Sequence, residues 1–114
     1  MNATHELAIF EAGISQKGEM GALANIIQPT IGILTSIGTA HQEGFETESE
    51  KRNEKWKLFE NAQIIIAPLS ELPINRMDAS HNLGTPSVIT WCRSGAATLK
   101  IHSEKIIQGQ THLQ

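Results

Sequence analysis

The stretch PTIGILTSIGTAHQEGF, residues 29–45, joins an apolar run to a turn rich in glycine and polar residues. Residues 30–37 are mostly β-branched or apolar, which predicts a buried strand. His41 follows where this strand is expected to end. In an open parallel α/β sheet, ligands bind beyond the carboxyl ends of the strands, because the following loops open on that edge. The stretch therefore predicts a strand and one residue of a candidate site.

Segments on both sides of this stretch continue the alternation of strand and helix. The apolar runs at residues 7–10 and 63–68 predict two further strands. Apolar residues spaced by three and four predict a helix over residues 18–27, which Pro29 ends. A βαβαβ order with short connections predicts an α/β fold, in which helices flank a mainly parallel sheet.

The helix expected after residue 46 carries a capping box. Thr47 can accept a hydrogen bond from a first-turn amide while Glu50 reaches back to the start of the helix. The helix is expected to extend to about Asn61, with Glu48 and Arg52 paired across one turn. Three residues are expected on or near its core side: Trp56, Phe59 and Ala62.

The second half of the chain is less regular. Residues 70–86 mix proline, asparagine, aspartate and glycine, and one short helix is expected over Asn75–His81. Residues 87–92 and 97–102 have the pattern of strands. Gly109 and Gln110, between Ile106-Ile107 and Thr111–Leu113, predict a final antiparallel hairpin.

Composition narrows the class of protein. The 114 residues, 39% hydrophobic and 18% charged, are expected to form one globular domain over residues 1–114. A net charge of −3 without a block of Lys or Arg argues against nucleic-acid and membrane partners. A single cysteine, Cys92, fits a reducing cytoplasm. The longest apolar run, Ile64–Ala67, is too short to cross a bilayer.

Three residues are candidates for a site. Glu11 closes the first expected strand and His41 follows the second, so both are expected at the same edge of the sheet. Taken alone, either could equally be an ordinary turn or loop residue. Lys55 lies at the boundary of the expected buried face, where desolvation can perturb the pKa of a lysine. Lys51 and Lys57 are expected to be solvated residues of the same helix.

The segment GISQKGEM, residues 13–20, has the two glycines of a phosphate-binding loop at the right spacing. It lacks the lysine and the hydroxyl that such a loop needs, and Glu19 and Met20 stand in their places. A negative side chain would therefore face the phosphates. The segment is interpreted as a turn that leads into the helix over residues 18–27.

Three segments resemble, in order and spacing, the central ATPase domain of the Mur ligases of peptidoglycan synthesis: IFEAGISQKGEM, PTIGILTSIGTAHQEGF and EKWKLF. The resemblance is close over residues 7–67. Within the family, the chain is most similar to members that add D-alanyl-D-alanine to UDP-N-acetylmuramoyl-tripeptide. The sequence IFEAGISQ is similar to the corresponding segment of members that are fused to an alanine racemase. Such a racemase would use pyridoxal phosphate in a domain downstream.

The resemblance implies a ligase that uses ATP to phosphorylate a substrate carboxylate before an amine attacks the acyl phosphate. Glu11 and His41 would each bind a magnesium ion, and Lys55, carbamylated by carbon dioxide, would help to hold the second ion. Lys55 is thus expected to be both a catalytic residue and a metal ligand. Ser36 stands where related enzymes often have asparagine.

The family's phosphate-binding loop, adenine-contacting segment and third domain are not found in these 114 residues. The chain is therefore expected to be a piece of a longer ligase that, alone, neither binds ATP tightly nor turns it over. An uncovered apolar edge or face predicts self-association. Two alternatives stay open: a ligase that adds glutamate to folate, and a binding or assembly module without chemistry. A third, a small metal hydrolase built on Glu11 and His41, would need a further ligand and a base that the sequence does not offer.

Overall fold

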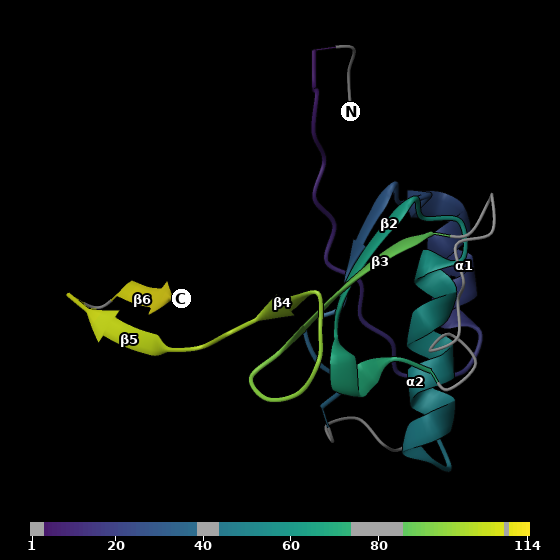
Figure 1. Ribbon diagram of the computed structural model, residues 1–114. Helices are drawn as coiled ribbons and strands as arrows, with labels where there is room; N and C mark the ends of the chain where they lie inside the picture. The colour runs from purple at the N-terminus through teal and green to yellow at the C-terminus, as the bar shows by residue number, and fades with distance from the viewer. Residues whose placement is uncertain (1–3, 39–43, 74–85, 109) are drawn as a thin grey trace.

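The computed structural model describes residues 4–38, 44–73, 86–108 and 110–114 (Figure 1). The elements in chain order are α1 (Glu19–Ile27), β1 (Ile31–Ile33), α2 (Glu48–Trp56), η1 (Lys57–Phe59), β2 (Ile64–Pro68), η2 (Leu69–Glu71), β3 (Ser87–Cys92), β4 (Leu99–Lys100), β5 (Glu104–Ile107) and β6 (Gln110–Leu113). The expected helix over Asn75–His81 lies outside the described residues.

Four strands form one parallel sheet in the order β1-β2-β3-β4. α2 connects β1 to β2, and Figure 1 shows α1 and α2 on one side of the sheet. The expected α/β fold is therefore confirmed. The antiparallel hairpin of β5 and β6 is also confirmed, and it stands apart from the sheet (Figure 1). None of the described helices is long and apolar enough to span a membrane.

The expected strand over residues 7–10 does not form. The segment has no ladder partner among the described residues, and β1 is the edge of the sheet. Leu7, Ile9 and Phe10 are exposed, and Figure 1 shows the segment running away from the sheet. An apolar run becomes a strand only where a neighbouring backbone supplies hydrogen bonds. The prediction from the apolar run alone is wrong here, and the strand expected over residues 97–102 shrinks to β4.

The helix with the capping box begins where expected. The side-chain oxygen of Thr47 accepts a hydrogen bond from the backbone N–H of Glu50 at 3.1 Å. The carboxylate of Glu50 accepts a bond from the N–H of Glu46, one residue before the cap. α2 then continues as the 3-10 turn η1 and ends two residues before the expected Asn61.

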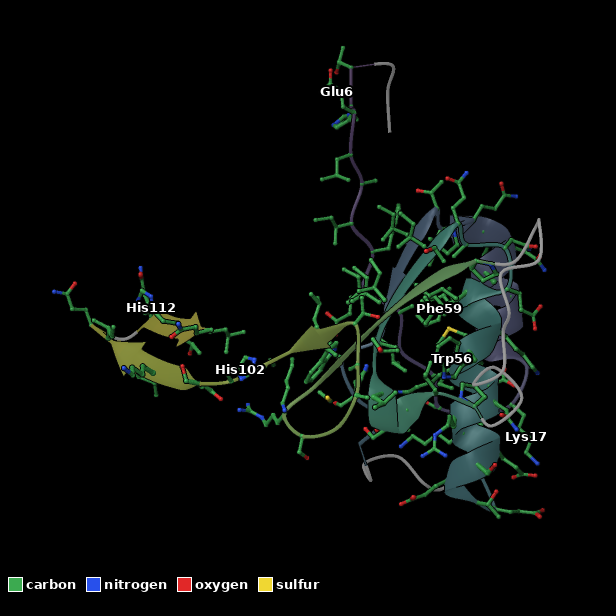
Figure 2. All side chains as sticks on the ribbon, viewed as in Figure 1. Glu6, Lys17, Trp56, Phe59, His102 and His112 are labelled. Carbon is green, nitrogen blue, oxygen red and sulfur yellow. The ribbon has the colours of Figure 1, made fainter. Side chains whose placement is uncertain are left out.

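The core lies between α2, η1 and the helix-covered face of the sheet. Its buried members are Leu34, Trp56, Phe59, Ala62, Ile65, Ala67 and Leu72. The three residues expected on the core side of α2 are among them. The rings of Trp56 and Phe59 meet edge to face with centroids 5.8 Å apart, between α2 and the sheet (Figure 2). Alternation along β2 points Ile65 and Ala67 toward the helices.

Gly32 in β1 lies directly against the ring of Phe59, where an added Cβ atom would collide with the ring carbons. We expect Gly32→Ala to lower the free energy of unfolding by about 1–3 kcal/mol, because a close-packed core cannot accept the extra methyl group without strain. Urea unfolding followed by circular dichroism measures this change.

Gly21→Ala is the matched control for this substitution. A Cβ atom at Gly21 meets nothing within 4 Å, and the residue lies inside α1. Alanine is the better helix former, so this variant should gain about 0.5–1 kcal/mol. Equal losses in the two variants would show that Phe59 does not restrict Gly32.

Candidate functional site

The face of α2 that carries Lys51 lies against the loops that follow β1 and β2. Nζ of Lys51 donates a hydrogen bond to the carbonyl oxygen of Gly38, after β1, at 2.6 Å. Nε1 of Trp56 donates to the carbonyl oxygen of Glu71, after β2, at 2.9 Å. These two bonds place α2 at the carboxyl edge of the sheet, where parallel α/β proteins bind ligands.

Lys55 is half-buried on α2, and the charges of Lys51 and Glu71 act on it. Burial lowers the pKa of Lys55, the positive charge of Lys51 lowers it further, and the carboxylate of Glu71 opposes the shift. A lowered pKa leaves more of the amine neutral at a given pH, and only the neutral amine can act as a nucleophile. The direction of the shift agrees with the perturbed pKa expected for Lys55.

The expectation that Lys51 is solvated is wrong. Only 4% of the residue is exposed, because its ammonium group turns inward to the backbone after β1. Lys57 is more exposed and pairs with Glu54 at 2.6 Å. The expected pair of Glu48 with Arg52 does not form either. Nε of Arg52 lies instead 3.4 Å from the carboxylate of Glu71, which the turn after β2 brings to this side of α2.

The segment over residues 13–18 is a turn that leads into α1, as expected. Gly18 precedes the helix with a φ of 90°, in the left-handed region that favours glycine. The carboxylate of Glu19 accepts hydrogen bonds from the backbone N–H groups of Ser15, at 2.6 Å, and Gln16, at 2.9 Å. Backbone amides that could cradle a phosphate are therefore occupied by a carboxylate of the same segment.

Two contacts tie this turn to α2. Nζ of Lys17 lies 3.0 Å from the carboxylate of Glu50, on the outer side of the junction. The backbone N–H of Gly18 donates to the carboxylate of Glu54 at 2.7 Å, on the buried side. The turn that follows Glu11 is therefore fixed to the helix that carries the candidate lysine.

Gly44 ties the same turn to the segment that follows His41. A Cβ atom at Gly44 would collide with the carbonyl oxygen of Ser15, so the two backbones are in close contact. The chain segments adjoining Glu11, His41 and Lys55 therefore pack against one another. This convergence comes from three separate parts of the sequence.

Of the three predicted site residues, the structure describes Glu11 and Lys55. Glu11 is exposed, and it makes no hydrogen bond or ion pair with Lys55 in the described part of the chain. His41 lies outside the described residues. Among the residues that the structure does describe, no group of three or more His, Cys, Asp or Glu side chains could hold a metal ion.

The donor groups that are described fit part of a magnesium site. Magnesium prefers oxygen ligands and is usually bound by one or two carboxylates together with water and substrate phosphates. Glu11 offers such a carboxylate, and its exposure leaves it open to a ligand. Lys55 as an amine is a poor magnesium ligand and would fit only after conversion to a carbamate, which supplies oxygen atoms.

The sequence patterns did not identify two carboxylates that lie near Lys55, those of Glu71 and Glu54. Glu71 follows β2 by three residues, so the rule that selected Glu11 and His41 would also have found it. Glu54 has no comparable signal, because an acidic residue on a helix rich in charges looks solvated. Only 4% of Glu54 is exposed in the folded chain.

The bonds of Glu19 predict a pH dependence of stability. The backbone N–H groups of Ser15 and then Gln16 hold the pKa of Glu19 below its ordinary value. The charged form is thus favoured by folding, so its stabilisation is present above the pKa of the unfolded chain and is lost as the pH falls through the lowered pKa. We expect the free energy of unfolding, measured with urea, to fall less between neutral and acid pH in Glu19→Gln than in the wild type. Glu48→Gln, at an exposed site on α2, should leave the wild-type slope.

Residues 1–112 match the family described as Mur ligase middle domain. The relatives that follow carry the name UDP-N-acetylmuramoyl-tripeptide-D-alanyl-D-alanine ligase. The protein of Rickettsia prowazekii is 31% identical over 113 residues, which cover 96% of this chain and 25% of the relative. The protein of Treponema pallidum is 39% identical over 59 residues, which cover 52% of this chain and 13% of the relative.

The protein of Borreliella burgdorferi is 36% identical over 67 residues, which cover 58% of this chain and 14% of the relative. The chain therefore spans a quarter or less of the length of these relatives. No solved structure gives a significant match.

Proposed function

The chain belongs to the Mur ligase middle domain family, and from this premise we propose that residues 1–114 form the later part of the ATP-using domain of a ligase of peptidoglycan synthesis. The ligase would join D-alanyl-D-alanine to UDP-N-acetylmuramoyl-tripeptide, the substrates in the names of the relatives. One observation carries the proposal: the segments that adjoin Glu11, His41 and Lys55 converge at the carboxyl edge of the sheet.

The proposed reaction has two steps. The terminal carboxylate of the tripeptide attacks the γ-phosphorus of ATP, which forms an acyl phosphate and releases ADP. The amine of D-alanyl-D-alanine then attacks the acyl carbon, loses a proton and displaces phosphate, which leaves a new amide bond. Bound magnesium would neutralise phosphate charge during the first step. The exposed carboxylate of Glu11 and the imidazole of His41 would each ligate one ion.

Lys55 would act as a carbamate. Its neutral amine attacks the carbon of carbon dioxide, a proton leaves for solvent, and the product is an anionic group with two oxygen atoms. The lowered pKa of Lys55, caused by burial and then by Lys51, supports this step because it increases the neutral fraction of the amine. The carbamate oxygens would supply the ligand that an amine cannot.

An assay of the full-length gene product tests the proposal. Phosphate release should require UDP-N-acetylmuramoyl-tripeptide, D-alanyl-D-alanine, ATP and magnesium together. Activity with folate and glutamate instead would favour the folate-type ligase, and no activity with either pair would favour a binding or assembly module. The gene sequence downstream of residue 114 tests the proposed fusion to an alanine racemase, which alone would bring in pyridoxal phosphate.

We also propose that the 114-residue chain, alone, is inactive. The relatives are at least four times longer than the matched segment, and amides of the turn over residues 13–18 are occupied by carboxylates. Calorimetry with magnesium-ATP should therefore show no tight binding, and tight binding would refute this. A cytoplasmic location fits the free thiol of Cys92.

Self-association of the chain is a further expectation. On the face of the sheet away from the helices, Ile31 and Ile33 are exposed, and so is Leu99. β1 also leaves an unpaired edge in the described sheet. A second copy could cover this surface. We expect light scattering to show dimers or larger species, and Ile33→Asp to shift them toward monomer, whereas Ile26→Asp on α1 should not. A clean monomer at high concentration would contradict this.

A further inference from the structure

Glu54 is a buried carboxylate with no part in the proposed reaction. Its Oε1 atom accepts hydrogen bonds from the backbone N–H of Gly18 at 2.7 Å and of Met20 at 3.3 Å. Its Oε2 atom accepts a bond from Nζ of Lys57 at 2.6 Å. With 4% of the residue exposed, both oxygen atoms are used inside the protein.

These bonds join the two described segments that carry site residues. Gly18 and Met20 lie at the start of α1, and only a short turn separates them from Glu11. Glu54 immediately precedes Lys55 on α2, and consecutive residues of a helix point about 100° apart. Glu54 therefore faces α1, while Lys55 points in another direction and interacts with the charge of Glu71.

We propose that Glu54 is a positioning residue that fixes the spacing between Glu11 and Lys55. The inference rests on the proposed function for the roles of those two residues. Hydrogen bonds to a charged acceptor are stronger than neutral ones, and a buried carboxylate that loses its donors is costly. The junction of α1 and α2 thus has one favoured arrangement. The pair of Lys17 with Glu50 joins the same segments, but it is partly exposed and constrains them less.

Spin labels measure this spacing directly. We would place nitroxides on E11C and K55C in a C92A background and record the distance distribution by pulsed electron paramagnetic resonance. E54L should broaden and shift the distribution, because leucine cannot accept the amide bonds. E54Q keeps a carbonyl acceptor and should stay near the wild type. E48L is the matched control on the exposed side of α2. A distribution that E54L leaves unchanged would overturn the proposal.

A second measurement applies if near-ultraviolet circular dichroism shows that E54L does not fold. The backbone amides of Gly18 and Met20 should exchange with solvent at least about tenfold faster in E54Q than in the wild type, because the charge of the acceptor is lost. The same exchange rates in the two proteins would overturn the proposal.

A spectroscopic signature separates positioning from general stabilisation. With ¹³C-bicarbonate, the wild-type chain should show a carbamate resonance at Lys55 that grows when magnesium is added. Folded E54L should lose this growth, whereas E54Q and E48L should keep it. Growth that is equal in all variants would overturn the positioning role. A wild-type chain without the resonance would contradict the proposed role of Lys55 instead, and the label distances would then decide the role of Glu54.

Discussion

Replacing Trp56 by alanine is expected to lower the free energy of unfolding by about 3–5 kcal/mol. Only 3% of Trp56 is exposed, and its ring packs edge to face on Phe59. The substitution removes the largest side chain of the core and leaves a cavity between α2 and the sheet. It also leaves the carbonyl oxygen of Glu71 without its donor. Urea unfolding followed by circular dichroism at 222 nm measures the loss.

Two further variants separate packing from hydrogen bonding. Trp56→Phe keeps an aromatic ring but removes the indole N–H, so a loss of about 1–3 kcal/mol is expected. Ile26→Ala, at a site that is 79% exposed on α1, should stay within about 0.5 kcal/mol of the wild type. If Trp56→Ala costs no more than Ile26→Ala, the core is not where the structure places it.

In the proposed full-length ligase, Lys55→Ala is expected to lower kcat by at least about a hundredfold, the usual effect of removing one group that stabilises charge in a transition state. The expectation follows from the proposed carbamate, whose oxygen atoms would hold magnesium near the transferring phosphate. Steady-state phosphate release at saturating substrates measures the change.

The choice of replacement tests the chemistry of Lys55. Lys55→Arg keeps the positive charge but does not supply an amine that forms the carbamate, so it should be as impaired as Lys55→Ala. A variant of Lys55→Arg with near wild-type kcat would show that the residue acts as a cation. Lys105→Ala, at an exposed site on β5, should leave kcat unchanged.

Several features of the fold follow from local sequence patterns. Glycine and proline bound α1, and its start at Glu19 is one residue from the expected position. The hydroxyl of Thr47 makes the expected bond at the start of α2. Spacing of three and four residues identifies Trp56, Phe59 and Ala62 as core residues. Each of these features depends on residues that lie within about one turn of one another.

The candidate site could be predicted only in part. The rule that sites lie at the carboxyl ends of parallel strands selects the edge of the sheet at which α2 contacts the loops after β1 and β2. It does not indicate that Lys51 turns inward, that Arg52 pairs with Glu71, or that Glu54 binds the start of α1. Those contacts join residues 13 to 36 positions apart, and a residue's own neighbours do not reveal its distant partner.

The sequence by itself determined the order of α1, β1, α2 and β2, the start of α2 and the burial of Trp56 and Phe59, because periodicity and capping are short-range properties of the chain. Only the tertiary structure decided that residues 7–10 are not a strand and that Glu54 is buried. A strand needs a neighbouring backbone, and a buried charge needs donors from another segment. The tertiary structure decides whether a segment gains such a backbone or such donors, because both come from distant parts of the chain.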